Sequence, residues 1–79
     1  MEEKSETAMK ARLVSAGLTL REAEVLLWVM RGKASSEIAL ILGAKTATIS
    51  RHLVHIYQKL GVENRTAAAN VASELIEYP

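Results

Sequence analysis

The segment from Thr46 to Leu60 carries the side chains whose types and spacing most clearly suggest chemistry. On a helix with about 100° per residue, one stripe of this segment is apolar and the opposite stripe is small or polar with a single arginine. The apolar stripe consists of Ile49, Leu53, Ile56 and Leu60, and the opposite stripe consists of Ala47, Ser50, Arg51, Val54 and Gln58. No acidic residue occurs between Glu37 and Glu63. Small groups beside one arginine suit a close approach to DNA base edges, because an acid there would repel phosphates.

This outer stripe predicts which side chains contact bases. Arginine pairs with the guanine edge through two hydrogen bonds, and small apolar groups contact the thymine methyl. The expected base contacts are therefore Ala47, Ser50, Arg51 and Val54. The alternative without a functional role is that Arg51 is an ordinary solvated arginine.

Hydroxyl and basic groups at the helix starts and on the flank of the same segment are expected to contact phosphates. They are Ser35, Ser36, Lys45, Thr46, Thr48, His55 and Lys59. The two serines are first of all candidates for capping a helix, and Thr48 could instead serve the first turn of its own helix.

Capping and stop signals predict the helices that must position this segment. Thr19 and Glu22 have the spacing of a capping box, and Gly32 would end the helix that they begin. Ser35 or Ser36 would cap a short second helix that ends at Gly43. The sequence thus predicts an all-α fold with four main helices near residues 19–31, 35–42, 46–60 and 65–77. A short helix, a tight turn and a longer helix is the arrangement by which helix-turn-helix proteins enter the major groove.

The apolar faces of these helices predict one hydrophobic core. Its expected members are Leu18, Val25, Leu26, Val29, Ile38, Leu42, Ile49, Leu53, Ile56, Leu60, Val62, Val71 and Leu75. Residues 1–17 are expected to form an N-terminal arm, either a frayed helix or a linker, that ends at Gly17. Residues 18–79 then form the helix-turn-helix domain.

Composition limits the other function classes. The chain of 79 residues has a formal net charge of +1, but residues 31–65 hold six basic and two acidic side chains. This concentration of positive charge in the middle of the chain favours a surface that faces phosphates. There is no cysteine, and His52 and His55 lack further ligands at suitable spacing, so neither a metal nor another cofactor is expected. No nucleophile–base pair or Gly-rich phosphate loop points to an enzyme. The lack of a long apolar run and the charged N-terminus favour a cytoplasmic protein without membrane contact. No small-molecule ligand is expected in this domain.

An ordered set of short motifs runs from about Leu18 to Ala72. In sequence they are Leu18-Thr19-x-Arg21-Glu22-x-Glu24-Val25-Leu26, Gly32, Glu37-Ile38-Ala39, Leu42-Gly43, Thr48-Ile49-x-x-His52, Ile56 and Lys59-Leu60-Gly61-Val62-x-Asn64-Arg65. Together they resemble the LuxR-type (GerE-like) helix-turn-helix domain of bacterial transcription regulators. The resemblance implies a four-helix domain that binds double-stranded DNA as a homodimer and regulates transcription. RNA polymerase is compatible with this role as a further partner. It also implies recognition by the helix over 46–60 and a dimer contact from the last helix, here assigned to Ala69, Ala72 and Ile76.

The sequence departs from the family pattern where relatives often have Ser and Asn-Lys, which here are Lys45 and Ser35-Ser36. Glu37 and Arg65 occupy family positions and are expected to form an intramolecular ion pair. Two other functions stay open. The first is a helical protein-interaction module that binds a partner through exposed Leu27, Met30 and Ile76, and the second is a sigma-factor-like polymerase-binding domain. The acid-free outer stripe favours DNA over the interaction module.

Overall fold

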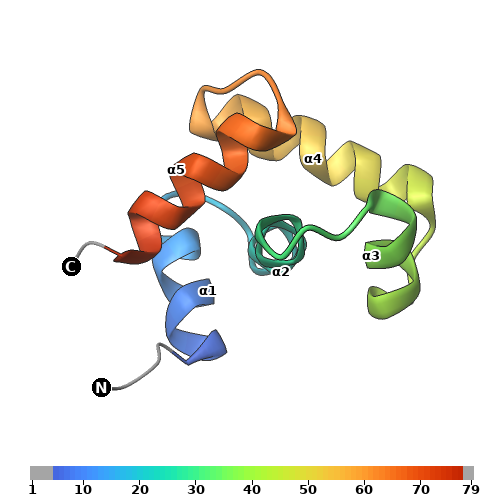
Figure 1. Cartoon of the computed structure of the whole chain (residues 1–79), viewed down its shortest axis with the longest axis horizontal. Coiled ribbons are helices and arrows are strands. Elements are labelled where there is room, and N and C mark those ends of the chain that lie inside the picture. The colour runs from blue at the N-terminus through green and yellow to red at the C-terminus, as the bar shows by residue number, and fades with distance from the viewer. Residues whose placement is uncertain (1–4, 78–79) are drawn as a thin grey trace.

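A computed structural model describes residues 5–77, which form five helices and no strand (Figure 1). Residues 1–4 of the expected arm and residues 78–79 lie outside this description. The helices are α1 (Glu6–Ser15), α2 (Leu20–Met30), α3 (Ser35–Leu42), α4 (Thr46–Leu60) and α5 (Arg65–Glu77). Central α2, seen end-on in Figure 1, contacts the four other helices. The predicted all-α class is confirmed, with five helices in place of four.

The capping box expected for α2 is observed, and a side chain also caps α5. The Glu22 amide donates to Thr19 Oγ1 at 3.1 Å, and the Thr19 amide donates to Glu22 Oε1 at 2.9 Å, which completes the capping box. At the start of α5, the Ala67 amide donates to Asn64 Oδ1 at 2.8 Å. These bonds satisfy amides that have no partner inside their helices.

The cap expected for α3 is wrong. Neither Ser35 nor Ser36 occupies the N-cap position, which belongs to Ala34, so no side chain there can accept a bond. Instead, Oε1 of Glu37 reaches back to the Ala34 amide at 2.7 Å. Further along, α3 ends at Gly43, whose φ of +68° lies in the left-handed region that favours glycine, and the chain turns directly into α4.

Most of the predicted core is buried. Eight of the expected residues have at most 6% of their surface exposed, namely Leu18, Val25, Leu26, Val29, Ile38, Ile49, Leu53 and Ile56. Five others are only half-buried, namely Leu42, Leu60, Val62, Val71 and Leu75. On α5 the buried stripe is Ala68, Ala72 and Ile76, spaced four residues apart.

The face of α5 was therefore assigned wrongly in two respects. Ala72 and Ile76 are 0% and 4% exposed inside the single chain, so they cannot form the dimer contact expected of them. Val71 and Leu75, which are expected in the core, are only half-buried, although Leu75 packs against the core. Of the three expected dimer residues, Ala69 alone keeps partial exposure.

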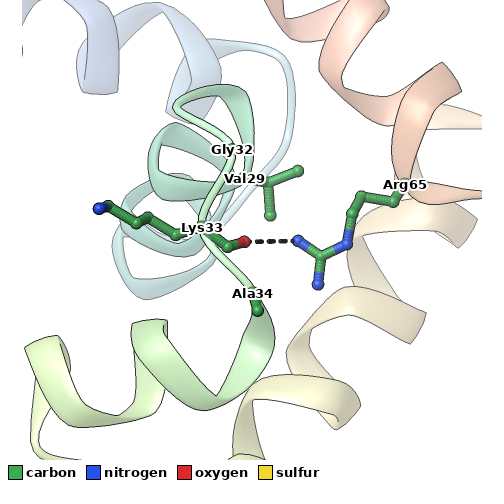
Figure 2. Close-up of a pocket in the computed structure, with 5 residues that line it drawn as sticks. All are labelled: Val29, Gly32, Lys33, Ala34 and Arg65. Atoms are coloured by element: carbon green, nitrogen blue, oxygen red, sulfur yellow. Dashed lines mark hydrogen bonds between the residues drawn. The ribbon is translucent and has the colours of Figure 1, made fainter.

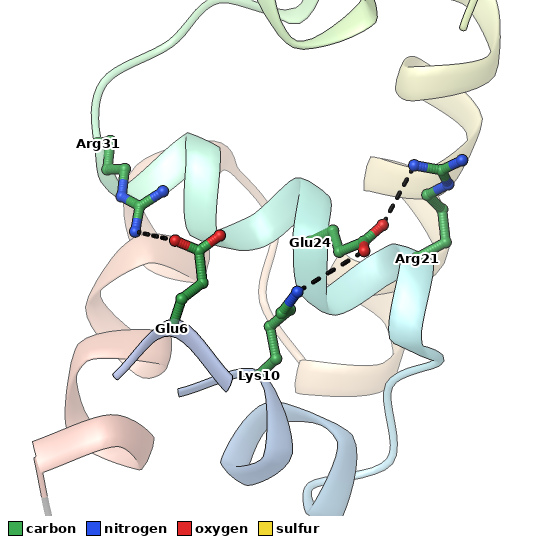
Figure 3. Close-up of polar contacts among 5 residues, drawn as sticks. All are labelled: Glu6, Lys10, Arg21, Glu24 and Arg31. Atoms are coloured by element: carbon green, nitrogen blue, oxygen red, sulfur yellow. Dashed lines mark hydrogen bonds and ion pairs between the residues drawn. The ribbon is translucent and has the colours of Figure 1, made fainter. Parts of the chain in front are cut away.

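Helix α1 is packed on the rest of the fold, against both α2 and α5. Leu13 is fully buried and belongs to the same hydrophobic core as those helices. Two ion pairs flank this contact (Figure 3): Arg31 Nη2 lies 3.0 Å from Glu6 Oε1, and Lys10 Nζ lies 3.8 Å from Glu24 Oε2. Residues 6–15 therefore form a docked helix, so the linker alternative does not hold for them.

The face of α2 that α1 covers includes a residue expected to bind a partner in the protein-interaction alternative. Leu27 lies on the same face as Glu24 and Arg31, the two residues paired with α1, and is only 2% exposed. Because Ile76 is buried too, two of the three apolar residues proposed to bind a partner belong to the protein's own core.

Candidate nucleic-acid interface

The outer face of α4 brings the four expected base-contacting residues together. Ile49, Leu53 and Ile56 are buried against the rest of the fold, which fixes how the helix is rotated about its axis. Consequently the opposite stripe is exposed, and it consists of Ala47, Ser50, Arg51 and Val54. Val54 is 51% exposed, and within residues 5–77 Arg51 has neither a hydrogen bond nor an ion pair. The arginine fork is thus available to an external acceptor.

The start of α4 carries exposed groups suited to an anion. Lys45 is the N-cap residue, and its side chain makes no capping bond. Thr46 is exposed beside it, and the first turn contains no acidic residue. The amides of a first helical turn and the helix dipole both favour negative charge. Along the helix, Thr48 is half-buried and His55 is exposed.

The two serines at the start of α3 differ in their surroundings. Ser36 is exposed, whereas Ser35 Oγ accepts a hydrogen bond from Arg65 Nη2 at 2.8 Å. Arg65 Nη1 also donates to the carbonyl of Lys33 at 2.9 Å, as Figure 2 shows. The expected ion pair between Arg65 and Glu37 is therefore wrong, because the guanidinium binds the loop before α3 and the carboxylate caps the helix.

A pocket of about 300 Å³ lies beside this arginine, lined by Val29, Gly32, Lys33, Ala34 and Arg65. In Figure 2 the ammonium of Lys33 points away from the guanidinium of Arg65, so the two charges do not converge on one ligand. The chief role of Arg65 here is to tie the loop between α2 and α3 to α5.

Lys59 differs from the other expected phosphate contacts, because its charge already has a partner. Its Nζ lies 2.8 Å from Glu22 Oε1, and the Glu22 side chain is 5% exposed. Burial raises the pKa of Glu22, but hydrogen bonds from Lys59 and the Thr19 amide, together with the Lys59 charge, outweigh burial and lower this pKa below its usual value. Glu22 was expected only to cap α2. Its position on the same stripe as Leu26 and Val29 was a signal that the carboxylate would be buried and need a cation.

Most of the chain matches the model of one protein family. Residues 16–72, which include all of α2, α3 and α4 and most of α5, match the model of the luxR family of bacterial regulatory proteins. The chain belongs to the luxR family. The resemblance inferred from the ordered motifs is thereby confirmed, and with it the helix-turn-helix class of the fold.

Relatives within the luxR family carry names of transcription regulators. The transcriptional activator protein AnoR of Acinetobacter nosocomialis is 48% identical over 52 residues, which cover 66% of this chain and 22% of AnoR. The HTH-type quorum-sensing regulator RhlR of Pseudomonas aeruginosa is 41% identical over 58 residues, which cover 73% of this chain and 24% of RhlR. The transcriptional activator protein PhzR of Pseudomonas fluorescens is 37% identical over 70 residues, which cover 89% of this chain and 29% of PhzR. The chain thus spans less than a third of the length of these luxR-family relatives, and no solved structure matches it significantly.

Proposed function

We propose that this chain binds double-stranded DNA in a sequence-specific manner and so regulates transcription, with α4 in the major groove. The observation that carries the proposal is the exposed, acid-free stripe on α4, with one arginine that has no partner within the described residues. The opposite stripe anchors the helix in the core, so the exposed side chains are held on a rigid support. Membership of a family of bacterial regulatory proteins supports the same function.

Within this proposal the side chains divide between bases and phosphates. Arg51 pairs with a guanine edge, Ala47 and Val54 contact thymine methyl groups, and Ser50 hydrogen-bonds to a base edge. The phosphate contacts come from the two helix starts and the flank of α4, namely Ser35, Ser36, Lys45, Thr46, Thr48 and His55. Such contacts set the register of the helix, and the base contacts supply the specificity.

We further infer that two copies bind one DNA site. The last helix would supply the contact, and its partly exposed apolar residues include Ala69, Val71 and Leu75. This small surface is too little for a strong dimer without DNA, so the free chain is expected to be largely monomeric. Contact with RNA polymerase would follow from binding near a promoter, and the cytoplasm, where bacterial DNA lies, is the proposed location. Among residues 5–77, none of the helices has the length and apolar character needed to cross a membrane.

Selection from random duplex pools at two salt concentrations, with the retained duplexes sequenced, tests the function. The proposal predicts enrichment of a short motif, present as two half-sites, that survives the higher salt concentration. Retention of unrelated sequences, with complete release at higher salt, would leave only non-specific charge attraction. Sedimentation of the protein with and without the selected duplex then tests assembly. Two copies on DNA and one copy in its absence are expected, whereas a tight dimer of the free chain at micromolar concentration would contradict the weak contact.

A further inference from the structure

The ion pair between Lys59 and Glu22 joins the end of the proposed recognition helix α4 to the start of central α2. We propose that Lys59 is a positioning residue for DNA recognition, which sets the tilt of α4 through Glu22 and contacts no phosphate. This inference rests on the proposed DNA binding. It concerns a residue of α4 that lies outside the exposed stripe and that we infer orients the helix.

The Glu22 carboxylate is fixed in place before it meets Lys59. Its Oε1 atom accepts the Thr19 amide at 2.9 Å and the Lys59 ammonium at 2.8 Å. The Glu22 amide in turn donates to Thr19 Oγ1. The capping box therefore holds a buried acceptor at one point, and Lys59 binds a rigid partner. Such a partner holds the long, flexible lysine side chain in one orientation.

The pair lies in the last turn of α4, where apolar burial is incomplete. Ile49 and Ile56 are fully buried, but Leu60 in the last turn is only half-buried. Apolar contacts such as those of Leu60 have no directional preference, so they constrain the tilt of this end less than a hydrogen bond does. The bond from Lys59 to Glu22 adds a directional contact with α2 at this end of the helix.

A small tilt at this end matters for recognition because Arg51 lies far along the helix. The fully buried Ile56 lies five positions after Arg51, which corresponds to about 7.5 Å along the axis. If the last turn is released, a tilt of roughly 10° about Ile56 would displace Arg51 by about 1 Å, more than the ~0.5 Å that a well-positioned contact tolerates.

A phosphate is a poor competitor for Lys59. If the ammonium moved to a phosphate, the Glu22 carboxylate, 5% exposed, would stay charged without its cation. An uncompensated buried charge is strongly unfavourable, so the intramolecular pair persists on DNA. Lys45 differs because it has no such partner within the described residues, although both lysines are exposed.

The test compares Lys59→Met, Glu22→Gln and the double variant with the parent on a selected duplex across a salt series, at a temperature where each is folded. Lys45→Met is the matched control. Positioning predicts that both single variants weaken binding by a similar factor, on the order of 3 to 10, and that the double variant is no weaker than the worse single one. The salt slope stays that of the parent, and Lys59→Arg, which keeps a cation for Glu22, restores most of the affinity. Lys45→Met instead lowers the slope by about one.

A shallower slope for Lys59→Met, with parental affinity in Glu22→Gln, would overturn the proposal and make Lys59 a phosphate contact. A lowered melting temperature with parental affinity in both variants would equally overturn it, since the pair would then serve stability alone.

A second measurement is independent of DNA. Residual dipolar couplings of the free protein report the direction of α4 relative to α2, and we expect this direction to change in Lys59→Met but not in Lys45→Met. The Lys59 variant leaves the capping box intact, so it remains informative if Glu22→Gln fails to fold. An unchanged direction of α4 would refute the positioning role, whereas failure of the parent to bind DNA would refute the proposed function alone.

Discussion

Arg65 Nη2, at the start of α5, donates a hydrogen bond to Ser35 Oγ at the start of α3, with 2.8 Å between the two atoms. The same guanidinium donates to the Lys33 carbonyl at 2.9 Å. One side chain thus joins the loop before α3 to the last helix of the fold. Since α3 packs against α4, this tie also supports the helix that we propose binds DNA.

Replacement of Arg65 should therefore destabilise the fold. Arg65→Ala removes two hydrogen bonds from a charged donor and leaves the Lys33 carbonyl and Ser35 hydroxyl without this partner. We expect the free energy of unfolding to fall by about 1.5–3 kcal/mol, measured by urea denaturation. Arg51→Ala is the matched control, because Arg51 is exposed and has no partner in the described chain, and it should change stability by less than about 0.5 kcal/mol. Equal effects of the two replacements would show that the Arg65 bonds contribute nothing net.

The helix ends and the orientation of α4 could be predicted because they depend on local signals. Thr19 with Glu22 marks the start of α2, and Gly43 marks the end of α3, through chemistry that acts over a few residues. The stripe formed by Ile49, Leu53 and Ile56 has an equally clear helical period, so the exposed face followed from it.

The rotation of α5 could not be predicted in the same way. This helix is rich in alanine and has apolar residues on several sides, so its sequence alone left the choice between Val71 and Ala72 open. Packing of the neighbouring helices decides that choice, and one of those neighbours is α1. Short helices gain most of their stability from tertiary contacts, so the sequence predicts residues 1–17 only as a frayed helix or a linker.

Docking of α1 predicts a stability effect far from the surface that we propose faces DNA. Leu13→Ala would leave a cavity in the shared core, and we expect a loss of about 2–5 kcal/mol in the free energy of unfolding. Val14→Ala, next in the chain but 40% exposed, should have a much smaller effect. Thermal denaturation of both variants is sufficient. If Leu13→Ala melts like Val14→Ala, then α1 is not part of the cooperative unit.

Glu22 predicts a contribution to acid sensitivity. Because its pKa is lowered in the folded chain, its pairing adds stability above the unfolded pKa, about 4.3 for glutamate, and that stability is lost as the pH falls through the lower folded pKa. The difference in unfolding free energy between the parent and Glu22→Gln should therefore be largest near neutral pH and shrink in acid. Denaturation across a pH series measures it. A constant difference would mean that the charge of Glu22 does not carry the effect.

The polar partners in the site were the hardest to predict from sequence. Lys59 and Glu22 are 37 residues apart in the chain, and Arg65 and Ser35 are 30 apart. Pairings at such separations depend on how the helices cross, which no local pattern specifies. The exposed stripe of α4 and its apolar anchor could be predicted, whereas the two long-range polar pairs that support α4 and α3 required the structure.

The most direct test of DNA recognition compares Arg51→Ala with Lys45→Met on the selected duplex and on a scrambled one, across a salt series. If α4 recognises base edges through Arg51, Arg51→Ala should cost about 1–3 kcal/mol on the selected duplex, little on the scrambled one, and relax the preference at one base pair. Lys45→Met should weaken both duplexes alike and lower the salt slope by about one. Equal losses on both duplexes for Arg51→Ala, with a shallower salt slope, would contradict the account, because Arg51 would then hold only the phosphate backbone.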